Sequence, residues 1–246
     1  MKKQGIYLII IAGVIFFVAA AASIKVFSQA TSGLDMSIDG KRISKEEYLA
    51  CMKSVEYETK IQIQQEYGTG YDKEFWIRQY GDCTGYEILA ENTVERLKYI
   101  HAVYEIGAQN GDVSDSGYEA VKKRWETENI RRSEVIGSGG VVYGLQEYTF
   151  DLYLQYEMSV LKETYCNNQS REGMNLTEEE MLEYYNSRDW IFGRDAQKAD
   201  FDTARIAVER ELREQKYDNM VMQRAENFKV DGDMESVAGF TLKNIK

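Results

Sequence analysis

The chain contains no proline in 246 residues, and this absence constrains its fold more than any other feature of the sequence. Proline is the strongest breaker of helices, so only glycine remains to divide the chain into segments. Glycine-free stretches at 145–172 and 194–231 are long enough for extended helices. Together with abundant Glu, Lys, Arg and Gln, this pattern predicts a mainly α-helical fold with a few short strands near its two ends.

The first thirty residues contain a long apolar run. Residues Ile6 to Ile24 carry no charge, and as a helix they span roughly 28 Å, about the thickness of a bilayer core. Lys2 and Lys3 precede the run, as expected on the cytoplasmic side. We therefore expect a retained single-pass membrane anchor in 1–30 and an extracytoplasmic domain in 31–246. The alternative is a signal segment that is cleaved after Ala30.

Charge and cysteine content exclude several classes of function. The chain has 30 basic and 41 acidic residues and a net charge of −11, which opposes binding to nucleic acid. An acidic, solvated surface or an affinity for basic clients remains open. Cys51, Cys83 and Cys166 are too few and too scattered for a disulfide scaffold, and their redox state is left open. The lack of a CxxC pair or a Cys/His cluster argues against zinc.

Local signals place several elements. Asp39-Gly40 predicts a tight type I′ hairpin turn, because both positions tolerate positive φ. Ser44 and Glu47 predict a capping box that starts a helix over 45–67, and Thr177 and Glu180 repeat this spacing. In both cases the side chain of the glutamate is expected to reach back to the cap residue.

Three further helices are predicted. The first covers 86–108, and its packing stripe consists of Ala90, Val94, Leu97, His101, Tyr104 and Ala108. The second covers 145–165 and is apolar on all sides, which places it at the centre of a bundle or at a surface that receives apolar ligands. The third covers 202–227 and is expected to pack on the N-terminal helices. Short strands are expected at 228–230 and 240–242.

No catalytic, cofactor-binding or metal-binding residue can be assigned from the sequence. His101 is the only histidine and lies on a packing stripe, which favours a structural role. Gly137-Ser138-Gly139-Gly140 lacks the Lys-Ser/Thr of a phosphate-binding loop, and Asp231-Gly232-Asp233 lacks the later ligands of a calcium loop. Aromatic residues make up 12% of the chain, which suits either half-exposed seams or an adaptable binding surface.

Several short motifs occur in an order that resembles the N-terminal chaperone domain of the SurA/PrsA family of bacterial extracytoplasmic foldases. The resemblance implies a helical, trigger-factor-like peptide-binding module. The parvulin-type isomerase domain of that family is absent, because only Arg188 to Ala199 separates Tyr185 from the last long helix. The motifs are Ile38-Asp39-Gly40, Ser44-x-x-Glu47, Tyr67-Gly68, Phe75-Trp76, Ala108-Gln109-Asn110-Gly111, Glu128-Asn129-x-x-Arg132, Tyr143-Gly144-x-x-x-Tyr148, Thr177-Glu178-Glu179-Glu180 and Tyr184-Tyr185.

Three hypotheses follow for the function. The first is a membrane-anchored, ATP-independent chaperone that binds unfolded or exported polypeptides through apolar surfaces, without cofactor or metal. The second is a dedicated assembly factor or structural partner of one exported or membrane complex. The third is a peptidyl-prolyl isomerase, as in the parvulin-bearing relatives of that family.

Overall fold

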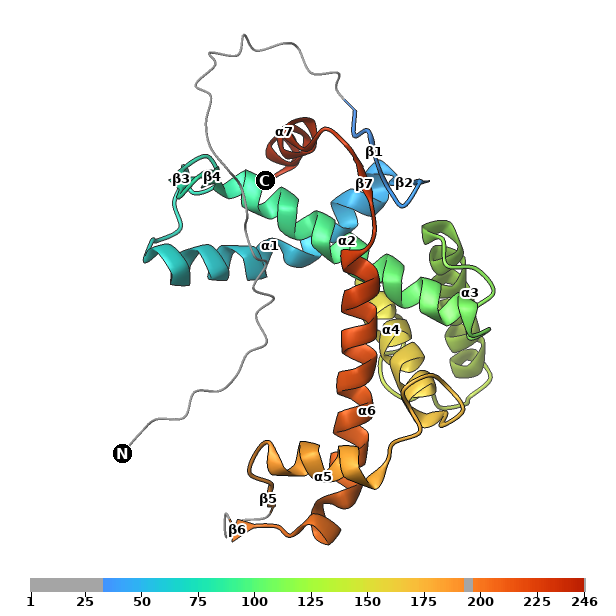
Figure 1. The fold of residues 1–246 in the computed structure, drawn as a ribbon. Coiled ribbons are helices and arrows are strands. Elements are labelled where there is room, and N and C mark those ends of the chain that lie inside the picture. Colours follow the sequence, from blue (N-terminus) through green and yellow to red (C-terminus); the bar gives the residue numbers. More distant parts are fainter. Residues whose placement is uncertain (1–32, 193–196, 246) are drawn as a thin grey trace. The chain divides into compact units, whose positions relative to one another are not determined.

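Helices dominate the computed structural model, which describes residues 33–192 and 197–245 (Figure 1). The predicted mainly α-helical class is confirmed. The helices are α1 Lys45–Tyr67, α2 Gly85–Gln109, α3 Tyr118–Gly137, α4 Phe150–Asn167, α5 Glu178–Asn186, α6 Phe201–Glu226 and α7 Met234–Asn244. The strands are β1 Met36–Ile38, β2 Lys41–Arg42, β3 Gln79–Tyr80, β4 Cys83–Thr84, β5 Ile191–Phe192, β6 Gln197–Lys198 and β7 Val230–Gly232.

The turn between β1 and β2 has the predicted conformation. Asp39 and Gly40 both take positive φ, at 50° and 74°, as a type I′ turn requires. On its other edge β1 pairs antiparallel with β7, so that Ile38 lies opposite Val230. The three-stranded sheet β2-β1-β7 therefore joins segments that are nearly two hundred residues apart in the sequence.

Helix α2 is the centre of the packing. It contacts α1, α4, α6 and α7, and the main hydrophobic core surrounds it. On the predicted stripe Ala90, Val94, Leu97 and Tyr104 are buried, whereas His101 and Ala108 are half-buried. The sequence placed the helix over 145–165 at the centre of the bundle as one option, but α2 holds that position.

Helix α6 packs in two parts. Its second half buries Tyr217, Val221 and Ala225 in the main core. Its first half lies against α5 (Figure 1). There Ala204 and Val208 are buried in a smaller cluster with Trp190, which follows α5 in the chain. Its bounds agree with the predicted helix to one residue at each end.

Three local predictions were wrong. The helix expected from residue 145 begins at Phe150 with Thr149 as its N-cap, because 138–148 form an ordered loop. Residues 240–242 are helical rather than extended, because Asp233 caps α7. Ser44 caps α1 as expected, but the Glu47 carboxylate bonds His101 instead of reaching back.

The predicted membrane segment, residues 6–24, lies outside the described residues, as does the possible cleavage site at Ala30. Among the helices that the structure describes, none is long and apolar enough to cross a membrane.

Candidate functional site

The loop between α3 and α4 exposes three apolar side chains. Val141 is 80% exposed, Tyr143 90% and Leu145 47%. Singly exposed apolar residues are normal on protein surfaces, but a group on one loop is a signal of recognition. The question is then whether the rest of the protein holds this loop in place.

The Arg132 side chain of α3 supports the loop from beneath. This side chain is only 5% exposed, and its guanidinium donates to the carbonyl oxygens of Tyr143, at 3.0 Å, and Leu145, at 2.5 Å. Its charge is balanced by Glu128, one helical turn away at 2.8 Å, and it lies over the ring of Tyr148. A buried guanidinium is tolerated only when its donors and charge are satisfied, so these bonds specify one loop conformation.

A second clamp holds the end of the loop. Asn129 bonds both backbone groups of Tyr148: its amide donates to the carbonyl and its oxygen accepts from the N–H, each at 2.9 Å. Trp125 Nε1 donates to the same carbonyl at 2.7 Å. The Tyr148 ring stacks on Tyr156 of α4 at a centroid separation of 5.2 Å. The loop is thereby joined to the surface of α4.

An apolar stripe continues along α4. Leu152, Tyr156 and Val160 follow one another at a spacing of four residues and are 42%, 43% and 38% exposed. This spacing places them on one side of the helix. We call these three residues and the three exposed loop residues, Val141, Tyr143 and Leu145, the apolar face.

Another side of α4 is held by a buried carboxylate. Glu157 accepts two hydrogen bonds from Arg124 of α3, at 2.7 and 3.0 Å. It also accepts from the hydroxyls of Tyr104 and Tyr153, both at 2.8 Å. Burial, followed by the nearby Glu157 carboxylate, raises the pKa of the Tyr104 hydroxyl, which therefore stays a donor. Helices α2, α3 and α4 thus hold the apolar face on a fixed support.

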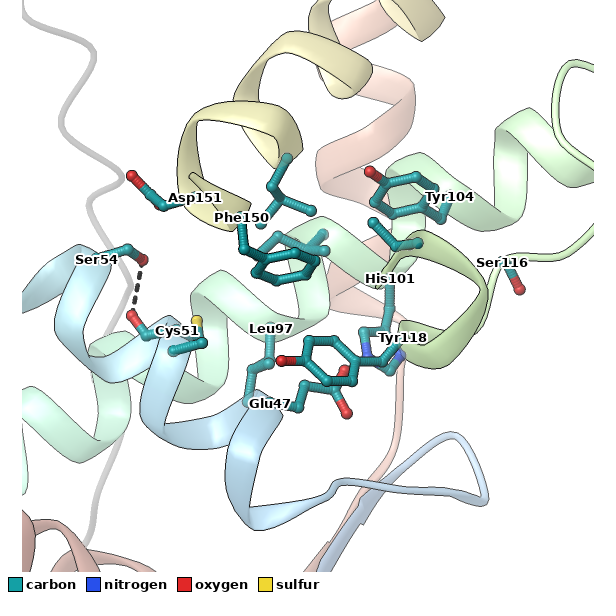
Figure 2. A pocket seen from close by; sticks show the side chains of 14 residues that line it. Glu47, Cys51, Ser54, Leu97, His101, Tyr104, Ser116, Tyr118, Phe150 and Asp151 are labelled. Carbon is teal, nitrogen blue, oxygen red and sulfur yellow. Dashed lines mark hydrogen bonds and ion pairs between the residues drawn. The ribbon is translucent and has the colours of Figure 1, made fainter. Parts of the chain in front are cut away.

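A small cavity lies behind this support, between α1, α2, α3 and α4 (Figure 2). Its volume is about 40 Å³, which is room for very few atoms. Leu97 of α2, Tyr118 of α3 and Phe150 of α4 line it, together with Glu47 and Cys51 of α1 (Figure 2). The lining is mainly apolar, and its size excludes a substrate-sized ligand.

The reactive side chains at this cavity are occupied structurally. His101 Nε2 lies 2.8 Å from Glu47 Oε1, and the Cys51 thiol faces the Thr93 carbonyl at 3.5 Å. Burial raises the pKa of the Cys51 thiol to about 12, so it remains protonated and a poor nucleophile. The cavity therefore offers no paired nucleophile and base.

Other sequence candidates also have structural partners. Gly137 ends α3, and Gly140 N–H bonds the Val135 carbonyl at 2.8 Å. Asp231 pairs with Lys229, and Asp233 accepts from the first backbone N–H groups of α7. Among residues 33–192 and 197–245, no group of three or more His, Cys, Asp or Glu could hold a metal ion.

Sequence reasoning named the supporting residues of the apolar face without recognising their connection. Glu128-Asn129-x-x-Arg132 and Tyr143-Gly144-x-x-x-Tyr148 were only markers in an ordered series of motifs. In the structure Asn129 bonds Tyr148, and Arg132 bonds Tyr143, so the two motifs are one unit. The signal available in the sequence was a run of apolar residues directly after a glycine break.

Comparison with known proteins gives one strong relative. No protein-family model matches the chain. A protein of Bifidobacterium longum subsp. longum named "Chaperone for lacto-N-biosidase" is 33% identical over 184 residues. The match covers 75% of this chain and 66% of the relative, so the chain spans just under two thirds of the relative's length.

A solved structure gives a weaker likeness. The GH136 lacto-N-biosidase of Eubacterium ramulus superposes with a TM-score of 0.46 at 14% identity, over 59% of this chain and 30% of that protein. At that score the likeness supports no conclusion. The resemblance to SurA/PrsA foldases was wrong, since the comparisons return no such protein. Over most of its length the chain is instead similar to a protein named as a chaperone for lacto-N-biosidase.

Proposed function

We propose that this chain is a dedicated chaperone for one partner enzyme, and that the partner is a lacto-N-biosidase. The observation that carries the proposal is the 33% identity to the Bifidobacterium chaperone over 184 residues. The sequence suggested a single-client assembly factor as the second hypothesis. A general chaperone with many clients, the first hypothesis, has less support because the relative's name specifies one enzyme.

The apolar face is the surface that we assign to the partner. It combines large exposed apolar side chains with a support that holds the backbone of the loop in one conformation before binding. A surface that is ordered in advance loses less conformational entropy on binding than a mobile loop does. Aromatic residues such as Tyr143 and Tyr156 supply much contact area with few rotatable bonds.

The proposed mechanism is shielding of one apolar region of the partner during its folding. Incompletely folded proteins aggregate through exposed apolar surface, and a bound chaperone removes that surface from solvent. If the chaperone binds only the native or near-native state of the enzyme, it also stabilises that state by mass action. We further propose that this occurs outside the cytoplasm, on the basis of the apolar run at 6–24 and its basic flank.

Co-expression tests this function. A lacto-N-biosidase is produced with the full chain, without it, and with the chain replaced by a general holdase. We expect the yield of soluble, active enzyme to rise severalfold only with this chain. An unrelated aggregation-prone enzyme, produced in the same way, is expected to gain nothing. Equal rescue of both enzymes, or of neither, contradicts a dedicated chaperone.

A further inference from the structure

A second hollow, a groove between α1, α2, α4 and α6, has a mainly polar lining, unlike the small cavity. It has a volume of about 440 Å³, within the range of ligand-binding sites. Arg96 and Tyr99 of α2, Gln155, Ser159 and Lys162 of α4, and Tyr217 of α6 line it. We call it the Arg96 groove.

Arg96 differs from the other arginines of the described chain. Each of the others has a carboxylate within 4.0 Å, even where the pair is fully exposed. Arg96 has none among the described residues, and its guanidinium lies 5.4 Å from the centroid of the Tyr99 ring. In a chain with a net charge of −11, an arginine without a carboxylate is an exception that calls for an external anion.

Tyr217, which lines the groove, carries an unsatisfied polar group. Tyr217 is 1% exposed, and its hydroxyl has no hydrogen-bond partner among the described residues. A buried hydroxyl without a partner costs roughly 1 to 3 kcal/mol, and among the described side chains Tyr217 shares this state only with Trp76 Nε1 and the Tyr80 hydroxyl. Beside it, Lys162 is already neutralised by both oxygens of Asp218, at 2.8 Å each. Arg96 is therefore the cation that is available to a ligand.

Two acids lie at the rim, and they limit what can bind. Glu58 and Asp151 line the groove but are exposed, whereas Arg96 and Lys162 are half-buried. Water screens the exposed acids more strongly than it screens the cations. These acids disfavour a highly charged anion such as a phosphate. A single carboxylate with N–H donors beside it suits the groove better, because the carboxylate can bond the cation and the N–H groups can bond the acids.

The position of the groove indicates the source of this carboxylate. On α4 the lining residues Gln155 and Ser159 directly precede Tyr156 and Val160 of the apolar face. A protein bound at the α4 part of the apolar face therefore lies next to the edge of the groove. We propose that the Arg96 groove binds the carboxylate of an aspartate or glutamate side chain in a polypeptide segment of the partner. The identity of that segment rests on the proposed function, but carboxylate binding does not.

The test uses the full chain and two small peptides that differ in one group. Acetyl-Ala-Asp-Ala-amide and acetyl-Ala-Asn-Ala-amide are titrated while the Arg96 side-chain NMR signal is followed. We expect the aspartate peptide to shift this signal and to bind at least about tenfold more tightly than the asparagine peptide. Arg96→Gln is expected to abolish the preference, and Arg96→Lys to retain part of it. Lys53→Gln, which removes an exposed charge of the same sign on α1, should leave it unchanged.

The remaining outcomes decide against the proposal. Equal binding of the two peptides, or an unchanged preference in a folded Arg96→Gln, overturns carboxylate recognition at this groove. Succinate binding as tightly as the aspartate peptide overturns the polypeptide source and assigns the groove to a free acid. These peptides do not involve the partner enzyme. If they fail while the chain still rescues the lacto-N-biosidase, the groove proposal is wrong and the proposed function stands.

Discussion

At the scale of single residues, Arg132 and Arg131 form a natural comparison on α3. Both bond the carboxylate of Glu128, but the Arg131 side chain is 54% exposed and that of Arg132 is 5% exposed. Only Arg132 also bonds the carbonyl groups of the loop. The same residue type at neighbouring positions therefore has a surface role in one case and a structural role in the other.

Replacing these arginines should have unequal effects. We expect Arg132→Gln to lower the free energy of unfolding by about 2 to 4 kcal/mol, because it removes a buried charged donor from the carbonyl groups of Tyr143 and Leu145. Arg131→Gln should change it by less than about 0.5 kcal/mol, as for most exposed ion pairs. Urea denaturation of both variants measures this difference. Similar values for the two would show that the loop does not depend on Arg132.

The cysteines give a prediction about reactivity. Burial raises the pKa of the Cys51 thiol to about 12 and that of Cys166 to about 11. Both therefore stay protonated at neutral pH and are shielded from reagents, whereas Cys83 is half-exposed. A thiol reagent at pH 8 should modify one cysteine of the native chain quickly and the other two only on unfolding. Mass spectrometry identifies which one, and fast labelling of Cys51 would contradict its packing.

At the scale of elements, the sequence was most informative where a structure depends on adjacent residues. The hairpin turn at Asp39-Gly40 and the caps at Ser44 and Thr177 require only local conformations and bonds. The last residues of the loop before α4, 145–148, were wrongly predicted as helix, because their conformation depends on Arg132 and Asn129 on another element. The partner of Glu47 was missed for the same reason, since His101 is 54 residues away.

The junction of α5 and α6 has a pH dependence that can be tested. The hydrogen bond from Lys216, with the N-cap contact to Thr177, lowers the pKa of the Glu180 carboxyl to about 2. A lowered pKa in the folded state contributes stability that is complete above the unfolded value, near 4.3, and is lost as the pH falls toward 2. Because the Glu180 side chain is 40% exposed, solvent limits this contribution to less than about 1 kcal/mol.

The loss of stability caused by Glu180→Gln should therefore become smaller in acid. We expect the variant to be less stable than the natural chain at pH 7 and nearly equal to it at pH 2.5, with the change between pH 4.5 and 2.5. Urea midpoints across this range measure it. Glu179→Gln, one residue away in the same first turn, is the matched control, since it lacks the bond to Lys216. A deficit in Glu180→Gln that does not depend on pH would contradict the role of this ion pair.

At the scale of the whole molecule, the class of fold could be predicted from the sequence and the candidate site could not. The central helix α2 and the two-part α6 show why. The spacing of apolar residues and the capping residues predicted the helices, and the predicted bounds were nearly right for α1, α2 and α6. The pairing of β1 with β7 and the assembly of the apolar face depend on contacts far apart in the sequence. Motifs that marked a resemblance to the wrong family are in fact the partners that hold the loop.

The apolar face predicts which substitutions reduce partner binding. The face is expected to contain the residues with the largest energetic contribution, and Tyr143 is its most exposed member at 90%. Tyr57 on α1, at 70%, and Ile206 on α6, at 83%, are exposed apolar residues outside the face. They are therefore matched controls for the loss of an exposed apolar side chain.

The affinity of the full chain for a folded lacto-N-biosidase, measured by titration calorimetry, tests the central claim most directly. We predict a single-site complex that Tyr143→Ser weakens by about thirtyfold, corresponding to about 2 kcal/mol, while Tyr57→Ser and Ile206→Ser change it by less than about threefold. Equal weakening by all three variants would contradict the assigned surface, and no binding by the natural chain would contradict a dedicated partnership.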